Sequence, residues 1–271
     1  DYGLSMRMAN RKYAVPRNVL KGRLEIFWVS LFRMRYFILL VFGYDPRIEN
    51  WDQSPFHHNE TGAQNKPTLA VRGSVVPVVE GTSDVKSRWT VNLCTRSDFD
   101  AAVAVADGAN PAGEGMFKAE RDGSVDARLQ AFLRSRGFPS WFTVTVGPKG
   151  SYRELDIISF LEKHLEEWTD GRDWRILLCD DYSAHKTANV WALCCSRGYI
   201  LIVHGGGATP VAQTVDTDLN QHVRRRYGEM ESRLLLAKMR AGAVVPMLTH
   251  EECMDVMFQV LSDPELLLIH L

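Results

Sequence analysis

Three aspartates that end or begin predicted elements could act together in phosphate chemistry. Asp180 ends the apolar run 176–179, which predicts a short strand buried on both faces of an α/β sheet. Asp52 lies near the end of a short predicted strand over 49–53, and Asp216 begins a predicted helix. Two-metal phosphodiester chemistry requires several carboxylates that converge on cations roughly 3.5–4 Å apart. Taken alone, Asp180 is equally well interpreted as a solvated strand end followed by a turn.

The elements that would bring these aspartates together fall into two blocks. Predicted β segments come first, over 49–53, 68–72, 89–94 and 103–107, with a further edge strand at 116–119. Helices and strands then alternate, with helices over 127–136 and 154–168, a strand over 175–180, a helix over 187–195, a strand over 199–203 and a helix over 216–239. This order predicts an α/β fold with a mixed five-stranded sheet flanked by helices. In the strand order 3-2-1-4-5, the strands that carry Asp52 and Asp180 are neighbours.

The amino-terminal region combines a predicted helix with an excess of positive charge. Pro16 precedes an amphipathic pattern, and the run 37–42 that follows it is expected to be buried. The apolar stripe of the helix consists of Leu20, Leu24, Phe27, Trp28 and Leu31. Residues 1–35 carry eight basic and two acidic side chains, 8 − 2 = +6, which leaves −1 − 6 = −7 for the rest of the chain. This asymmetry indicates either a polyanion near the amino end or a solvated linker helix.

Length and composition limit the class of protein. With 271 residues, 45% hydrophobic and 24% charged, the chain has an ordinary globular composition and room for one large domain or two small ones. Its five cysteines lack C-x-x-C spacing, which argues against a disulfide framework or a zinc site and favours a reducing compartment. The most apolar segment, 27–44, contains two arginines and is too short and too charged to span a bilayer, so no membrane partner is expected. No signal peptide opens the chain, and because it begins at Asp1 we expect a fragment that lacks upstream modules.

Four stretches, in a fixed order, carry a resemblance to a known family. They are 50–55 (N-W-D-Q-S-P); 86–95 (K-S-R-W-T-V-N-L-C-T) with 106–108 and 117–118; 177–180 with His185; and 206–209 with 213–216 and Asn220. Together they resemble the motifs of the catalytic domain of DDE superfamily endonucleases and transposases of the pogo/Tigger (jerky-like) group. Each motif is weak alone, but the ordered set covers about residues 45–230, and the spacing 216 − 180 = 36 is similar to the family's.

The resemblance implies a ribonuclease H-like fold and a metal-dependent DNA endonuclease that also joins strands. Asp52, Asp180 and Asp216 would then be the catalytic, metal-binding triad for two Mg²⁺ or Mn²⁺ ions. Three further residues would support the triad, namely His185, Gln213 and Asn220. The implied partners are DNA and a second copy of the chain on transposon ends, and the implied compartment is the nucleus.

The same resemblance divides the chain into three regions. Residues 1–45 would be a basic helical linker, 46–245 the ribonuclease H-like DDE catalytic domain, and 246–271 a helical tail. Within the second region, Arg224, Arg225 and Arg226 on the predicted helix could neutralise DNA phosphates. A run of arginines on a helix is also typical of a solvated face.

Departures from the family pattern leave alternatives open. Thr214 and Gly205 stand where the family has proline, which could change how the helix that carries Asp216 is presented. The stretch 59–62 (N-E-T-G) resembles another family opening in which asparagine would replace the first acid, but Asp52 leaves a more fitting distance to the next strand. The alternative function is a domesticated, catalytically inactive protein that binds DNA or chromatin. His185 is also well explained as a structural histidine, and coincidental acids on an unrelated α/β scaffold remain a third interpretation.

Overall fold

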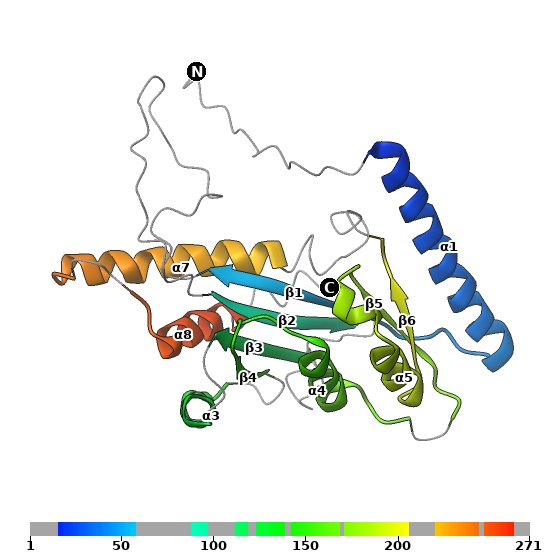
Figure 1. The fold of residues 1–271 in the computed structure, drawn as a ribbon. Helices are drawn as coiled ribbons and strands as arrows, with labels where there is room; N and C mark the ends of the chain where they lie inside the picture. The colour runs from blue at the N-terminus through cyan, green and yellow to red at the C-terminus, as the bar shows by residue number, and fades with distance from the viewer. Residues whose placement is uncertain are drawn as a thin grey trace, which may run out of the picture.

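One mixed sheet organises the part of the chain that the structure describes (Figure 1). The computed structural model describes residues 16–57, 88–96, 112–118, 123–138, 142–168, 171–205, 220–243 and 247–262. The sheet has six strands in the order β4-β3-β2-β1-β5-β6. Asp216, Gln213, the alternative opening at 59–62 and the predicted β segments 68–72 and 103–107 lie outside the described residues.

The elements follow the predicted succession of strands and helices. The strands are β1 (Ile48–His57), β2 (Arg88–Arg96), β3 (Ala112–Lys118), β4 (Phe142–Gly147), β5 (Arg175–Cys179) and β6 (Tyr199–Val203). The helices are α1 (Arg17–Phe42), α3 (Ser124–Arg136), α4 (Glu154–His164), η1 (Ser183–Lys186), α5 (Ala188–Ser196), α7 (Asn220–Arg240) and α8 (His250–Leu261). The predicted alternation of helix and strand after residue 150 is therefore confirmed.

The strand directions confirm the predicted fold class. β1 pairs antiparallel with β2, and β2 pairs antiparallel with β3, whereas β5 runs parallel to both β1 and β6. The five strands β3-β2-β1-β5-β6 reproduce the order 3-2-1-4-5 and the mixed directions of a ribonuclease H-like sheet. The prediction of five strands was wrong, because β4 adds a sixth strand parallel to β3 at the edge. The Phe-Thr-Val-Thr-Val run of β4 alternates buried and half-buried side chains. This pattern is typical of a strand, but the strand was not predicted from the sequence.

The first strand is longer than expected. It was predicted to stop at Ser54-Pro55, but β1 continues to His57, so Asp52 lies within the strand and not at its end. The ladder with β5 covers only Ile48 to Asn50, so beyond Asn50 one side of β1 has no strand partner in the ladder. Proline is tolerated on such an open side because no ladder hydrogen bond is lost there.

Helix α1 corrects two further expectations. The run 37–42, predicted as a separate buried segment, is the last part of α1, and of its six residues Ile38 alone is buried. Trp28, predicted to belong to the buried stripe, is exposed. The helix ends at Gly43, whose left-handed φ of 79° is a conformation that glycine adopts without strain. Among the described residues, no helix combines the length and apolar character that a bilayer span requires.

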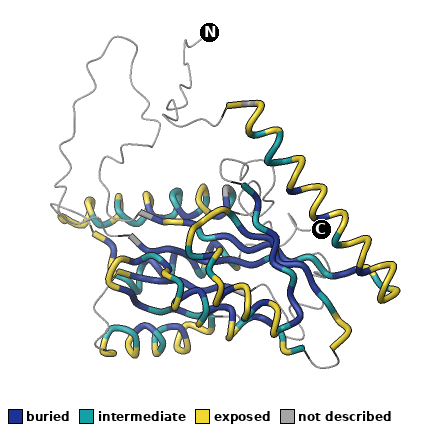
Figure 2. The backbone as a smooth tube through the Cα atoms, turned by 45° about the vertical axis from the view of Figure 1, so that its right-hand side comes forward, coloured by how far each residue is buried: buried dark blue, intermediate teal, exposed yellow. Residues whose placement is uncertain are grey.

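Each face of the sheet carries its own layer of helices. One face packs against α4 and α5 through a core that includes Trp51, Leu177 and Leu201. We call the opposite side the α7 face; alternation along β1 places Asn50, Asp52, Ser54 and Phe56 on it. On that side, α1 covers β5 and β6, and α3, α7 and α8 cover the other strands. Figure 2 shows the resulting sandwich as buried strands between partly exposed helices.

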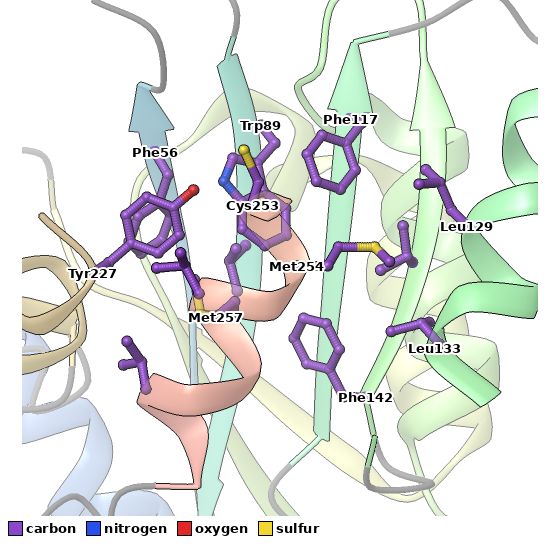
Figure 3. Close-up of a cluster of buried hydrophobic side chains, with 14 of the residues drawn as sticks. Phe56, Trp89, Phe117, Leu129, Leu133, Phe142, Tyr227, Cys253, Met254 and Met257 are labelled. Carbon is purple, nitrogen blue, oxygen red and sulfur yellow. The ribbon is translucent and has the colours of Figure 1, made fainter. Parts of the chain in front are cut away.

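Aromatic and sulfur-containing side chains fill the α7 face between β1 and β4 (Figure 3). Trp89 of β2 stacks on Phe117 of β3, with ring centroids 4.5 Å apart and ring planes 6° from parallel. Met254 and Met257 of α8 pack into the same cluster. Helix α8 thus belongs to the core of the sheet, while the predicted region boundaries at 45 and 245 stay predictions.

The tight contact between Gly115 and Trp89 gives the first testable prediction. A Cβ at Gly115 would lie 2.6 Å from Cζ3 of Trp89, which is itself held by the stack on Phe117. We expect Gly115→Ala to lower the free energy of unfolding by about 1–3 kcal/mol through overpacking. Urea unfolding monitored by circular dichroism measures the change.

A matched glycine separates packing from backbone effects. Gly228 lies within α7, and nothing lies within 4 Å of the position that its Cβ would take. Gly228→Ala is therefore expected to raise the stability by about 0.5–1 kcal/mol through helix propensity. Equal stability of Gly115→Ala and the parent would show that the contact with Trp89 is not restrictive.

Candidate active site

The pairing of β1 with β5 places two of the three predicted acids at one level of the sheet. The last paired residues of this parallel ladder are Asn50 and Leu178. Asp52 and Asp180 each follow by two positions, 52 − 50 = 2 and 180 − 178 = 2. Because side chains alternate between faces with a period of two, this count keeps Asp52 on the α7 face with Asn50 and gives Asp180, one residue past β5, the same parity as Leu178.

Both acids act on one neighbouring buried thiol. Burial raises the pKa of the Cys179 thiol, and the carboxylates of Asp180, Asp181 and Asp52 raise it further. Asp52 is 5% exposed, whereas the side chain of Asp180 is 32% exposed. The pair therefore comprises one buried carboxylate and one that solvent or a ligand can reach.

Asp180 is held by the turn and the short helix that follow β5. Nδ1 of His185 lies 2.7 Å from Oδ1 of Asp180, and the backbone N–H of Tyr182 donates to the same oxygen at 3.2 Å. Burial alone would raise the pKa of Asp180, but the hydrogen bond and charge of His185, with smaller effects of Tyr182 and His204, lower it. Both contacts use Oδ1, and no hydrogen bond from the described residues reaches Oδ2.

His185 is fixed on its other sides. Its Nε2 lies 3.3 Å from Nε2 of Gln53, and its ring packs on Trp51 with centroids 4.4 Å apart. His185 is itself 1% exposed. The ring thus joins β1 to the turn that carries Asp180, which is a positioning role consistent with the sequence spacing of five residues.

Asp52 is held by the first residue of α7. Nδ2 of Asn220 donates a hydrogen bond to Oδ2 of Asp52, and both residues are buried. Asn220 thereby joins the site directly, whereas Gln213, the other predicted supporting residue, lies outside the described residues.

Helix α7 lies along β1 and makes three successive side-chain contacts with it (Figure 1). After the Asn220–Asp52 contact, the Arg224 guanidinium donates to Ser54 Oγ at 3.0 Å. Tyr227 then packs edge-on against Phe56, with ring centroids 5.0 Å apart. The steps are two residues on the strand and three or four on the helix, so the α7 face of β1 meets one side of α7.

His204, which the sequence did not single out, lies next to Asp180 on the side of β6. Cys179 and Val203 are the last paired residues of β5 and β6, so His204 stands level with Asp180. His204 is fully buried, its backbone N–H donates to the Cys179 carbonyl at 3.1 Å, and its ring meets Phe27 of α1. The row Asp52, Asp180, His204 therefore crosses three strands. The position of His204, one residue past the predicted strand 199–203, was the signal in the sequence that could have pointed to it.

The remaining charged candidates have intramolecular partners. Asp181 pairs with Lys186 at 2.6 Å and is exposed, which agrees with its interpretation as a solvated neighbour. Arg225 and Arg226 both approach Glu229, at 3.3 Å and 3.7 Å. Arg224 contacts Ser54 on the strand that carries Asp52, and the predicted role of the trio in DNA binding stays a prediction.

The donor atoms present suit a hard cation, but they are incomplete. Within the described segments, no group of three or more histidine, cysteine or acidic residues is placed to hold a metal ion. Asp52 and Asp180 offer carboxylate oxygens, the ligand type that Mg²⁺ and Mn²⁺ take. The third predicted ligand, Asp216, lies in the stretch before α7 that the structure does not describe.

Comparison with known proteins gives structural neighbours of one kind. Neither a protein-family model nor a curated protein matches the sequence. A chain of the Mos1 strand transfer complex is similar at a TM-score of 0.45 and 12% identity, over 97% of this chain and 61% of that chain. A chain of the Mos1 mariner paired end complex with Mn gives a TM-score of 0.42 and 13% identity, over 97% and 62%. This chain thus spans about three fifths of the length of these neighbours.

The hydrogen bond between α7 and β1 can be measured directly. Asp52→Ala and Asn220→Ala each leave a buried polar partner, so their effects on unfolding should be non-additive. A double-mutant cycle is expected to give a coupling of about 1.5–3 kcal/mol, the range for a hydrogen bond to a charged group.

Asn189 supplies the control for this cycle. It lies on α5 and donates to Glu154 at 2.9 Å, on the opposite side of the sheet. Asp52→Ala combined with Asn189→Ala should be additive within about 0.5 kcal/mol. Additivity in the Asn220 cycle as well would contradict the proposed anchoring of Asp52.

Proposed function

We propose that this chain is the catalytic region of a DNA transposase, a metal-dependent endonuclease and strand transferase of the DDE type. Its substrate would be duplex DNA, whose phosphodiesters are first hydrolysed and then rejoined by a DNA 3′-hydroxyl. The expected compartment is the nucleus. The proposal combines the ordered sequence motifs with the arrangement of the acids in the sheet.

One observation carries the proposal. Asp52 and Asp180 come from segments 128 positions apart, 180 − 52 = 128, yet each stands two positions beyond the last pair of the parallel ladder between β1 and β5. Open α/β sheets bind ligands at the carboxyl ends of their parallel strands, and this pair lies just past the carboxyl end of the β1–β5 ladder. Two carboxylates side by side repel each other, so the arrangement is favourable chiefly when a cation joins them.

The chemistry of the donors fits divalent cations. Asp180 keeps Oδ2 without a hydrogen bond from the described residues, and its side chain is 32% exposed. Asp52, Asp180 and Asp216 are the residues proposed to hold two Mg²⁺ or Mn²⁺ ions, as predicted from the motifs. Such ions, when bound, stabilise the negative charge that develops on phosphate oxygens.

The surrounding residues orient the acids. His185 and the Tyr182 amide fix Oδ1 of Asp180. Because both oxygens belong to one carboxylate, these contacts also fix the position of Oδ2. Asn220 fixes Asp52 from α7. Since residue 216 lies only four positions before Asn220, 220 − 216 = 4, that contact also ties the start of α7 to the site. Residues that hydrogen-bond to metal ligands hold those ligands in a fixed orientation in this way.

The basic side chains of α7 provide the proposed path for DNA. Arg225 is largely exposed, and its ion pair with Glu229 at 3.3 Å is a surface pair of little energetic weight. A phosphate could therefore replace Glu229 at small cost. Arg224 extends from the same helix to Ser54, two residues past Asp52 on β1, which would bring a bound backbone close to the acids.

Removal of one carboxylate charge tests the enzyme directly. Asp180→Asn keeps the shape of the side chain and is expected to abolish Mg²⁺-dependent nicking of supercoiled plasmid. His185→Ala, which removes the partner of Oδ1, is expected to reduce nicking about 10–100-fold. Gel-based nicking rates in Mg²⁺ and in Mn²⁺ give both values.

The adjacent acid is the matched control. Asp181→Asn removes the same charge one residue away, at an exposed position paired with Lys186, and should nick like the parent. Equal rates for Asp180→Asn and the parent would sink the enzymatic proposal. A parent chain that binds duplex DNA but never nicks it would instead support the inactive, DNA- or chromatin-binding alternative.

The proposed DNA path predicts a change in salt dependence. If Arg225 neutralises one phosphate, Arg225→Ala should make the slope of log affinity against log salt concentration shallower by about one. Fluorescence anisotropy with a labelled duplex over a salt series measures that slope. Arg233→Ala, an exposed change further along α7, serves as the control. An unaltered slope for Arg225→Ala would place the DNA elsewhere.

A further inference from the structure

Helix α1 carries two apolar stripes on opposite sides. The inner stripe packs against β5 and β6 and consists of Leu20, Leu24, Phe27, Leu31, Met34 and Ile38. The outer stripe consists of Gly22, Ile26, Val29, Arg33, Tyr36 and Leu40. Both sets advance by alternating steps of four and three residues, the spacing that places side chains along one side of a helix facing another helix. At about 100° per residue, Val29 lies about 180° from Leu20.

The outer stripe faces away from the sheet. Ile26 is 70% exposed and Leu40 is 65% exposed, and Val29 and Tyr36 are also exposed. Figure 2 shows exposed segments recurring along the whole length of α1. Contiguous exposed apolar surface of this kind marks an interaction site more often than a bare surface.

Charges on the outer side indicate what the partner is. Arg33 interrupts the apolar stripe and makes no ion pair with any described residue. Within the described part of the chain, Glu25, eight positions earlier, has one exposed ion pair, with Lys21 at 3.7 Å. A helix that supplied a carboxylate opposite Arg33 would complete the stripe, and α1 itself carries that carboxylate.

An antiparallel copy of α1 centred on Val29 satisfies both charges at once. In that register, positions whose numbers sum to 58 lie opposite each other, so Glu25 faces Arg33 of the second copy, 25 + 33 = 58, and the pair occurs twice. The same register sets Gly22 against Tyr36 of the second copy, 22 + 36 = 58. Gly22 has no atom within 4 Å of a Cβ position, so it leaves room for a large ring. A parallel pair would instead oppose Arg33 with Arg33.

We propose that α1 is a self-association helix, which packs against α1 of a second copy of this chain through the outer stripe. The contact is isologous, the usual form of a two-fold homodimer. A bilayer surface is the less suitable occupant, because it would bury Arg33 among the apolar residues without a carboxylate. The inference does not rest on the proposed nuclease function.

A charge swap tests both the surface and the register. On the full chain at micromolar concentration, light scattering after size exclusion should give the mass of two chains for the parent. Arg33→Glu and Glu25→Arg should each give the mass of one chain, because like charges then face each other. The double variant Glu25→Arg with Arg33→Glu should recover the two-chain mass. Arg134→Glu, an exposed change on α3, is the control and should remain two-chain.

Several outcomes would overturn the proposal. A parent of one-chain mass would do so, as would two-chain masses for all the variants, or single variants that are monomeric without rescue by the double variant. Co-sedimentation of a monomeric parent with anionic phospholipid vesicles would assign the stripe to a membrane surface instead. Circular dichroism confirms that each variant is folded. Plasmid nicking by Arg33→Glu is measured separately, so loss of self-association and loss of nuclease activity are distinguishable.

Discussion

The proximity of two like charges is the constraint on which the rest of the site depends. The ladder between β1 and β5 brings Asp52 and Asp180 to one level of the sheet. Each acid is stabilised by a polar donor from a later segment, Asn220 from α7 and His185 from η1. The fold thus assembles the acids first by backbone pairing and then restrains each carboxylate with a neutral or titratable partner, which preserves their net negative charge for a cation.

Helix α7 links this constraint to the surface of the molecule. Its buried side contacts β1 through Asn220, Arg224 and Tyr227, while Arg225 is exposed to solvent. Tyr227 of the helix packs into the aromatic cluster with Phe56 and Trp89 (Figure 3). The packing of α7 against the core therefore positions both its first residue, Asn220, and its arginines near the acids.

Much of the fold was predictable because the patterns were local. The runs that became β5 and β6 are apolar and short, and the alternation of helix and strand after residue 150 followed from periodicity. The predictions that were wrong concern residues whose structure depends on tertiary contacts. Pro55 suggested a strand end, but the open side of β1 tolerates it, and the last residues of α1 looked buried although only one side of that helix meets the sheet.

The site itself was predictable in part for a similar reason. Asp180 stood out because charge follows an apolar run, and motif order pointed to Asp52. His204 directly follows the predicted strand 199–203, but its relation to Asp180 exists only through the register of β5 with β6. Contacts such as Asn220 with Asp52 join residues 168 positions apart, 220 − 52 = 168, and no local pattern encodes them.

The same register limits which length changes the chain can accept. Extra residues in the segment between β1 and β2, or between β2 and β3, leave the alignment of positions 48–50 with 176–178 untouched. Deletion of one residue between Asn50 and Asp52 would rotate the carboxylate to the α4 and α5 side of the sheet, because orientation reverses with every step along a strand. Lineages of this chain should therefore vary freely in loop length yet hold a fixed two-residue spacing from the ladder to each acid.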